Sequence, residues 1–274
     1  MNTIIIAEIG ENHYGNWTLC HAMVEQAAAN GATYAKFQTY TAEEFGRDHQ
    51  WYDEFKKVEM PTSMHFEMQA LCEQLNVGFL SSAFTVGSAG FLIDNMGLDK
   101  LKLASSRVTD LKLLDYVNNR ANQVKTVFLS SGMATLDEMG TAVDHLTAID
   151  KLYLLQCTSQ YPTDDENVNL RAMLALHDAF PQHGYGFSDH SRGIDAACAA
   201  IAMGAQVIEK HFTFHTALPG DDHEGALTPE TLAELCQRAQ RIENMLGSAT
   251  KGPVPDEKTA LDNLRVKMKE VTYE

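Results

Sequence analysis

Length, composition and charge already exclude several classes of protein. The chain has 274 residues, of which 45% are hydrophobic, and its formal net charge is −16. A chain of this length can bury a full core as one domain, and so strong a negative charge argues against nucleic acid or an anionic membrane as a partner, since both attract basic surfaces.

Apolar, β-branched runs alternate with amphipathic segments along the chain. The strands we expect are 3–9, 34–38, 78–82, 100–103, 126–130, 152–157, 185–188 and 207–212, and the helices are 18–30, 65–75, 87–96, 111–119, 136–146, 170–179, 194–203 and 229–246. Eight strand–helix alternations predict a parallel sheet covered on both faces and closed into a (β/α)8 TIM barrel. An open doubly wound sheet is the alternative, but no Gly-rich dinucleotide fingerprint follows the first strand.

Two segments depart from this alternation. Residues 41–63 are polar and aromatic and are too many for an ordinary connection, so we expect a functional or mobile loop. Residues 249–274 are charged, and we expect one helix packed on the outside of the barrel domain, which spans 1–248.

The cysteines and the apolar runs indicate a cytoplasmic protein. The five cysteines are scattered, odd in number and without CxxC spacing, which suits reduced thiols. The apolar run 1–9 is too short for a signal peptide, and no segment approaches the ~18 apolar residues of a membrane helix.

Two histidines stand at the ends of neighbouring expected strands. His190 follows the strand 185–188 and His211 ends the strand 207–212, with one Ala-rich helix between them. Because a strand, a helix and a parallel strand form a right-handed crossover, both histidines should open onto the same face and can share one ion. On spacing alone, two separately hydrogen-bonded histidines are an equally good interpretation.

Polar residues also end the other strands, where a barrel carries its active site. A lone lysine at such a position is more often a surface residue, and a lone serine is usually a helix cap. Their occurrence on all eight strands, with two lysines and many hydroxyls, instead favours a site for phosphate or carboxylate. The residues are Glu8, Lys36, Gln38, Ser81, Ser82, Lys102, Ser105, Arg107, Ser130, Ser131, Thr158, Ser159, Tyr161, Ser188, His190, Glu209 and His211.

Seven blocks, in order along the chain, resemble the sialic acid synthase family, which includes the pseudaminic and legionaminic acid synthases. The blocks are Ala7–His13, Lys36–Thr39, Ser130–Met133, Gln156–Thr163, Ser188–Ser191, Glu209–Thr213 and Pro219–His223. The resemblance implies a TIM-barrel enzyme that condenses phosphoenolpyruvate with an open-chain, N-acylhexosamine-like aldose, giving a 3-deoxy-2-ulosonic acid and phosphate. It also makes a homodimer possible.

The resemblance also implies roles for particular residues. His190 and His211 would hold a divalent ion, Mn²⁺ or Mg²⁺, since imidazoles combined with oxygen ligands suit an octahedral ion better than a closed zinc site. Glu8, Gln38, Tyr161 and Asp222 would face the sugar, with Glu8 a candidate for proton transfer. Phosphoenolpyruvate would be bound by Lys36, Ser82, Lys102, Ser105, Ser130, Ser159 and Ser188.

Three departures from the family keep two alternatives open. Arg107 replaces a glutamate of the sugar site, Ser159 stands where an asparagine is expected, and the sequence ends at Glu274, before the antifreeze-like domain that usually follows the barrel. The reversed charge at Arg107 allows a phosphorylated or acidic aldose, as in the deoxyoctulosonate and deoxyheptulosonate phosphate synthases. It also allows a degenerate barrel that binds a sugar or phosphate without turnover.

Overall fold

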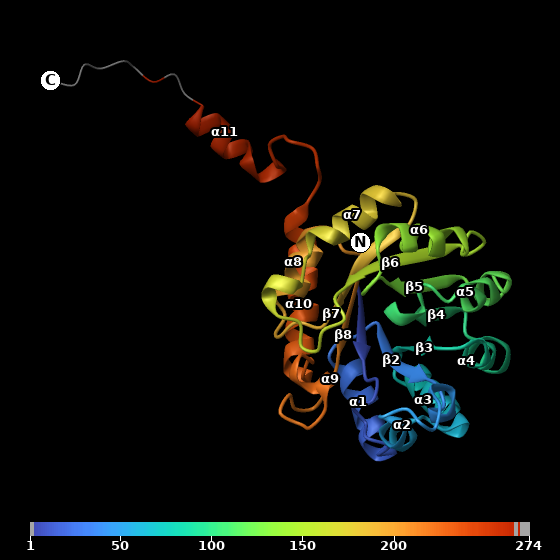
Figure 1. Cartoon of the computed structure of the whole chain (residues 1–274). Helices are drawn as coiled ribbons and strands as arrows, with labels where there is room; N and C mark the ends of the chain where they lie inside the picture. The colour runs from blue at the N-terminus through green and yellow to red at the C-terminus, as the bar shows by residue number, and fades with distance from the viewer. Residues whose placement is uncertain (1–2, 266–267, 269–274) are drawn as a thin grey trace.

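The eight expected strands close into a parallel barrel, in chain order (Figure 1). The computed structural model describes residues 3–265 and residue 268. Strand β1 pairs with β2 on one side and with β8 on the other, so that the sheet has no free edge. The strands are β1 Ile4–Glu8, β2 Tyr34–Thr39, β3 Gly78–Ala83, β4 Lys100–Leu103, β5 Thr126–Ser130, β6 Lys151–Cys157, β7 Gly184–Asp189 and β8 Val207–His211. The prediction of a TIM barrel is confirmed.

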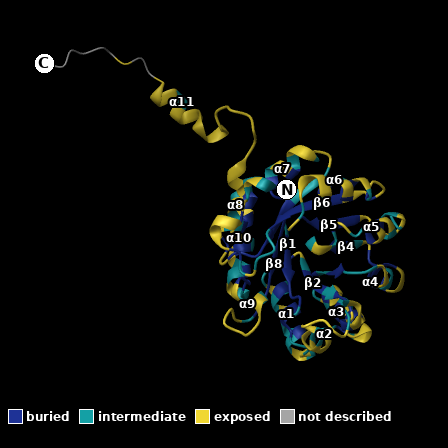
Figure 2. Ribbon diagram, viewed as in Figure 1, coloured by how far each residue is buried: buried dark blue, intermediate teal, exposed yellow. Residues whose placement is uncertain are grey.

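Helices surround the barrel, and their buried faces pack on the outer face of the strands (Figures 1 and 2). Local capping explains where several of them begin: Asn16 accepts from the Leu19 amide before α1, and Thr135 forms a capping box with Glu138 before α6. The helices are α1 Trp17–Ala29, α2 Tyr52–Val58, α3 Thr62–Gln74, α4 Val86–Gly90, α5 Leu111–Asn118, α6 Leu136–Asp144, α7 Arg171–Ala179, α8 Asp195–Ala202, α9 Asp221–Glu224, α10 Pro229–Leu246 and α11 Lys258–Leu264.

The inside of the barrel changes from apolar to polar along the direction of the strands. Since successive side chains on a strand point to opposite faces, residues two apart share the inner face. A buried apolar layer is formed by Ile6, Leu80, Phe128, Leu155 and Val207. Two residues further along the same strands, a second layer holds Glu8, Ser82, Ser130, Cys157 and Glu209. This alternation places polar side chains at the carboxyl end of the barrel, next to the apolar layer.

Three segments differ from the expectations. Residues 41–63 form the short helix Ala42–Phe45 and then α2, instead of an irregular loop, because the rings of Tyr40, Phe45 and Phe55 pack against one another. The helix expected over 87–96 is α4 followed by a wider, π-helical turn, Phe91–Asn95.

The C-terminal tail contains a helix, α11, but that helix extends away from the barrel instead of packing on it (Figure 1). Most of its residues are exposed, and its few apolar side chains offer too little surface to hold it against the barrel (Figure 2). The prediction for 266–267 and 269–274 falls outside the described residues. Within the described part of the chain, no helix combines the length and apolar character needed to span a bilayer.

Candidate active site

The polar layer surrounds a cavity of about 290 Å³ at the carboxyl end of the barrel. Five residues singled out from the sequence do not line this cavity: Ser81, Arg107, Ser131, Thr158 and Asp222. The other residues to which the family resemblance assigned a role all line it. They are Glu8, Lys36, Gln38, Ser82, Lys102, Ser105, Ser130, Ser159, Tyr161, Ser188, His190 and His211. Residues from all eight strand ends therefore meet in one place, as the closed barrel requires.

The floor of the cavity is a network of four buried charges. The Lys36 ammonium lies 2.7 Å from Glu8 Oε2 and 3.7 Å from Glu209 Oε2, and the Lys102 ammonium lies 3.4 Å from Glu209 Oε1. Glu209 also accepts a hydrogen bond of 3.0 Å from the Ser188 hydroxyl. Because both lysines and both carboxylates are buried, each charge depends on its neighbours for compensation.

The network determines the protonation of its members. Burial opposes ionisation of Glu209, but the ammonium groups of Lys102 and Lys36 outweigh it and lower the pKa of Glu209 to about 2. Burial would lower the pKa of Lys36, yet the Glu209 and Glu8 carboxylates outweigh burial and raise that pKa. Burial dominates at Lys102 and lowers its pKa, with Glu209 offsetting part of the effect. The floor thus pairs the amino groups of two lysines with two carboxyl groups.

Hydroxyl groups line the wall beside Lys102. Ser130 Oγ is buried and has no hydrogen-bond partner within the described residues, so its donor and acceptor are free for a ligand. Ser105 Oγ accepts a hydrogen bond of 3.0 Å from the Gly132 amide. A Cβ at Gly132 would lie 2.4 Å from Ser159 Oγ and 2.7 Å from Ser105 Oγ. Glycine at this position therefore leaves room for both hydroxyls beside its backbone.

The two histidines lie together at the top of the cavity, as the strand spacing predicted. Their ring centroids are 5.5 Å apart, and the Tyr161 ring lies 4.1 Å from that of His190. His190 Nδ1 lies 2.8 Å from the Thr158 carbonyl oxygen; if Nδ1 donates there, Nε2 keeps its lone pair. Burial lowers the pKa of His211 to about 3, which keeps this ring neutral, and its Nδ1 is buried without a hydrogen-bond partner.

This donor set fits a shared ion. Two adjacent imidazoles, each with a nitrogen available, are the usual nitrogen ligands of a divalent metal. Asp222 supplies a nearby oxygen, because its Oδ2 lies 3.5 Å from His211 Nδ1. Within residues 3–265 and 268, no cluster of three or more His, Cys, Asp or Glu side chains is close enough to form a complete protein ligand set, so the remaining ligands would come from substrate or water.

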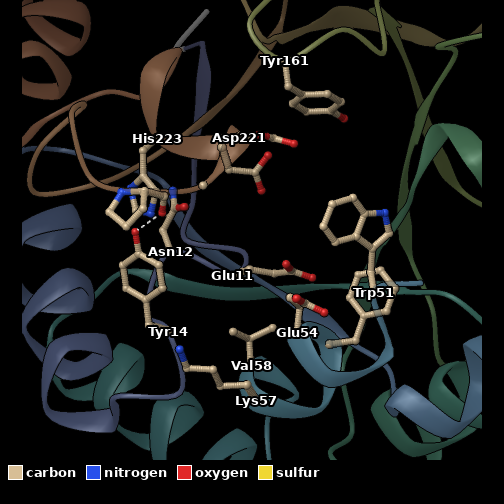
Figure 3. Close-up of a pocket in the computed structure, with 14 residues that line it drawn as sticks. Glu11, Asn12, Tyr14, Trp51, Glu54, Lys57, Val58, Tyr161, Asp221 and His223 are labelled. Carbon is tan, nitrogen blue, oxygen red and sulfur yellow. Dashed lines mark hydrogen bonds between the residues drawn. The ribbon is translucent and has the colours of Figure 1, made fainter. Parts of the chain in front are cut away.

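A second cavity, of about 610 Å³, adjoins the first, with Tyr161 lining both. Asp222 lies in its wall, and Figure 3 shows the carboxylates of Glu11 and Asp221 directed toward the open centre, opposite the Trp51 ring. Its lining also includes Glu54 and Lys57, so that four carboxyl groups face one ammonium group. Burial raises the pKa of Glu11 to about 7 and also raises that of Asp222. The raised pKa values reduce the negative charge of these two groups, but the lining still has an excess of acidic over basic side chains, which disfavours anions.

Arg107 is not part of either cavity wall. Its guanidinium is half-buried and lies 3.4 Å from the Phe84 carbonyl oxygen and 3.8 Å from Asp110 Oδ2. Ser106, which the sequence analysis did not single out, lines the first cavity instead. The contacts of Arg107 with the Phe84 carbonyl and Asp110 hold its side chain outside the lining.

Comparisons with known proteins agree with this arrangement. The model of the NeuB family matches residues 23–251. The chain belongs to the NeuB family. The N,N'-diacetyllegionaminic acid synthase of Campylobacter jejuni is 34% identical, covering 96% of this chain and 83% of that protein. The N-acetylneuraminate-9-phosphate synthase of Homo sapiens is 33% identical, covering 95% of this chain and 76% of that protein. This NeuB-family chain is accordingly an enzyme of the sialic acid synthase type.

A solved structure shows the same fold over almost the whole chain. The N-acetylneuraminic acid synthetase of Leptospira borgpetersenii, solved in complex with citrate, superposes with a TM-score of 0.90 at 32% identity. The alignment covers 97% of this chain and 94% of that one. This chain and that relative therefore share the barrel fold.

Several lining residues of this NeuB-family chain were not proposed as site residues from the sequence. Glu209 was recognised only as a polar strand end, although it stands two residues before His211 and so shares its inner face. The same alternation could have found Cys157 at the end of β6. Phe84, Ser106 and Met133 follow strand ends on loops, where the sequence carries no periodic signal.

Proposed function

We propose that this enzyme condenses phosphoenolpyruvate with an uncharged, open-chain aldose, giving a 3-deoxy-2-ulosonic acid and phosphate. The observation that carries the proposal is the joint presence of two buried lysines, a wall of hydroxyls and two adjacent imidazoles in one cavity. Phosphoenolpyruvate needs donors for two anionic groups, and the sugar aldehyde needs an electrophilic partner beside them.

The anionic groups of phosphoenolpyruvate would bind at the floor and the hydroxyl wall. Lys36 and Lys102 would provide charge-assisted hydrogen bonds, and the unpartnered Ser130 hydroxyl would add a neutral donor. Ser105, Ser159, Ser82 and Ser188 would complete this binding surface. The paired carboxylates Glu8 and Glu209 hold the two ammonium groups in place before the ligand arrives.

His190 and His211 would hold Mn²⁺ or Mg²⁺, with oxygen ligands from water and the sugar. Such an ion, when bound, withdraws electrons from a carbonyl oxygen and makes its carbon open to attack by the weakly nucleophilic carbon 3 of the enol phosphate. The Tyr161 ring lies beside that of His190 at the boundary of both cavities and would orient the aldehyde. Attack forms the new carbon–carbon bond, and the former carbonyl oxygen takes up a proton.

Glu8 is placed to handle protons in this reaction. It is buried, its Oε2 lies beside the Lys36 ammonium, and its Oε1 accepts a hydrogen bond of 3.1 Å from Gln38. Water adds at carbon 2 of the former phosphoenolpyruvate and loses a proton, and the carbon–oxygen bond to phosphate then breaks. A carboxylate fixed by two donors can accept a proton without moving.

The second cavity would receive the rest of the acceptor. Its four carboxyl groups and single lysine favour an acceptor rich in hydroxyl or amide donors over a phosphorylated or acidic one. The position of Arg107, outside both linings, removes the strongest reason for an anionic acceptor. A phosphorylated acceptor remains the second candidate, because relatives of similar identity include a synthase named for a 9-phosphate product.

Phosphate release tests these functions directly. The protein, with Mn²⁺ and phosphoenolpyruvate, is incubated with free N-acylhexosamines and, in parallel, with their 6-phosphates. We expect release with one or more free sugars. Phosphate release only with the sugar 6-phosphates would establish a phosphorylated acceptor. No phosphate release with any sugar would favour a barrel that binds without turnover.

A further inference from the structure

A buried ion pair lies directly behind the two histidines. Asp189 and Lys210 are opposite each other as the last paired residues of β7 and β8, and each immediately precedes a histidine in the chain. Their side chains are 0% and 1% exposed. Since side chains alternate along a strand, they point away from the cavity, on the same side as Phe187 and Ile208, which belong to the outer core.

The contacts of this pair span both histidine-bearing strand ends. Lys210 Nζ lies 3.0 Å from Asp189 Oδ2 and donates a hydrogen bond to the Ser191 carbonyl oxygen. Asp189 Oδ1 accepts from the Ser191 amide at 2.8 Å and from the Ser191 hydroxyl at 2.7 Å. The residues on both sides of His190 are thus fixed to the residue before His211.

Bulk stability is a poor explanation for such a pair. Removing two charges from water costs much of what their attraction returns, and apolar residues of similar volume often serve a core equally well. The outer core around Phe187 and Ile208 is apolar, so it would accept such residues. Apolar residues could not form the directional hydrogen bonds that link the ends of β7 and β8 and so set their relative position.

We propose that Asp189 and Lys210 are positioning residues that align His190 and His211 for one shared divalent ion. The inference rests on the proposed function, because it assumes that the two imidazoles bind that ion. Groups that orient metal ligands from outside the coordination shell typically change metal affinity by about 10- to 100-fold when they are replaced. Neither residue lines either of the two cavities.

The test replaces the pair without changing its shape. The double variant Asp189→Asn with Lys210→Met removes both charges and retains similar volumes and an oxygen for Ser191. We expect its Kd for Mn²⁺ to rise by about 10- to 100-fold, while its urea midpoint stays near that of the parent. At saturating Mn²⁺, KM for phosphoenolpyruvate should be unchanged.

The matched control makes the same two substitutions in an exposed pair. Lys100 lies 2.7 Å from Asp99 at the opposite end of the barrel, and Asp99→Asn with Lys100→Met should leave Mn²⁺ affinity unaltered. His190→Ala identifies the measured site, because it should abolish Mn²⁺ binding there. If the parent binds Mn²⁺ and the Asp189/Lys210 variant binds it equally well, the positioning role is refuted.

Two further outcomes separate this inference from the proposed function. A parent protein that binds no Mn²⁺ would overturn the proposed metal site and the positioning role with it. If the double variant fails to fold, Ser191→Ala provides the test, since it removes one bond to Asp189 and keeps the ion pair. Unchanged Mn²⁺ affinity in this folded variant would count against the positioning role, and a several-fold loss would support it.

Discussion

Replacing Lys102 by methionine should weaken phosphoenolpyruvate binding far more than it weakens the fold. A hydrogen bond to a charged group contributes about 1.5–3 kcal/mol, and tenfold in affinity corresponds to about 1.4 kcal/mol. We therefore expect KM for phosphoenolpyruvate to rise about 10- to 150-fold. Glu209 would keep Lys36 at 3.7 Å and the Ser188 hydroxyl, so its charge would remain partly compensated. The free energy of unfolding should fall by about 1–3 kcal/mol, less than for an isolated buried pair.

The assay is phosphate release at saturating sugar and Mn²⁺, with phosphoenolpyruvate titrated, beside urea unfolding of the same variants. Lys100→Met is the control, because Lys100 stands on the same strand and the same face as Lys102 but pairs with Asp99 outside the cavity. Lys100→Met should leave KM for phosphoenolpyruvate unchanged. Its free energy of unfolding should differ from that of the parent by no more than about 0.5 kcal/mol. An unchanged KM in folded Lys102→Met would refute the assignment of the floor to an anionic substrate.

Three other variants test the remaining parts of the site. Ser130→Ala removes a hydroxyl with no partner in the described chain, so KM for phosphoenolpyruvate should rise roughly 2- to 12-fold while the urea midpoint stays constant; a lower midpoint with unchanged KM would contradict this. Gly132→Ala would displace the hydroxyls of Ser159 and Ser105, and kcat/KM should fall although the variant folds. The pKa of Glu11, raised from 4.5 to about 7, penalises its ionised form, so folding stability should decrease as pH rises from about 4.5 to 7. In the Glu11→Gln variant, the loss of unfolding free energy between pH 5 and pH 8, measured by urea unfolding, should be smaller than in the parent by up to about 3 kcal/mol. An equal loss in parent and variant would argue against a raised pKa of Glu11.

The barrel could be predicted because each part of it has a local signal. Alternating apolar runs and amphipathic segments mark the eight strands and the helices that follow them, and a closed parallel sheet is the arrangement that covers both faces of every strand. The strand ends also carry the two histidines and both lysines. Once the closed topology is assumed, their convergence follows from it.

The second cavity could not be predicted in this way. Its wall combines Glu11 and Trp51 with Asp221, which are far apart in the chain and belong to a loop, an aromatic segment and a short helix. Trp51 lies directly before α2, in a segment whose Phe45 and Phe55 rings pack on each other, and no period in the sequence records such packing. The sequence also proposed Arg107 as a site residue, whereas its contacts with Phe84 and Asp110, which the sequence does not record, hold its side chain outside the cavity.

The sequence by itself determined the order of strands and helices, the polar character of the strand ends and the family to which the chain belongs. These follow from short-range patterns, because hydrophobic period and strand-end composition are properties of neighbouring residues. Only the tertiary structure decided that Glu209 joins the two lysines, that Asp189 pairs with Lys210 on the outer side of the strands that end at the histidines, and that acidic groups dominate the second cavity. Each depends on distances between separate strands and loops, and those distances are set by the closing of the whole barrel.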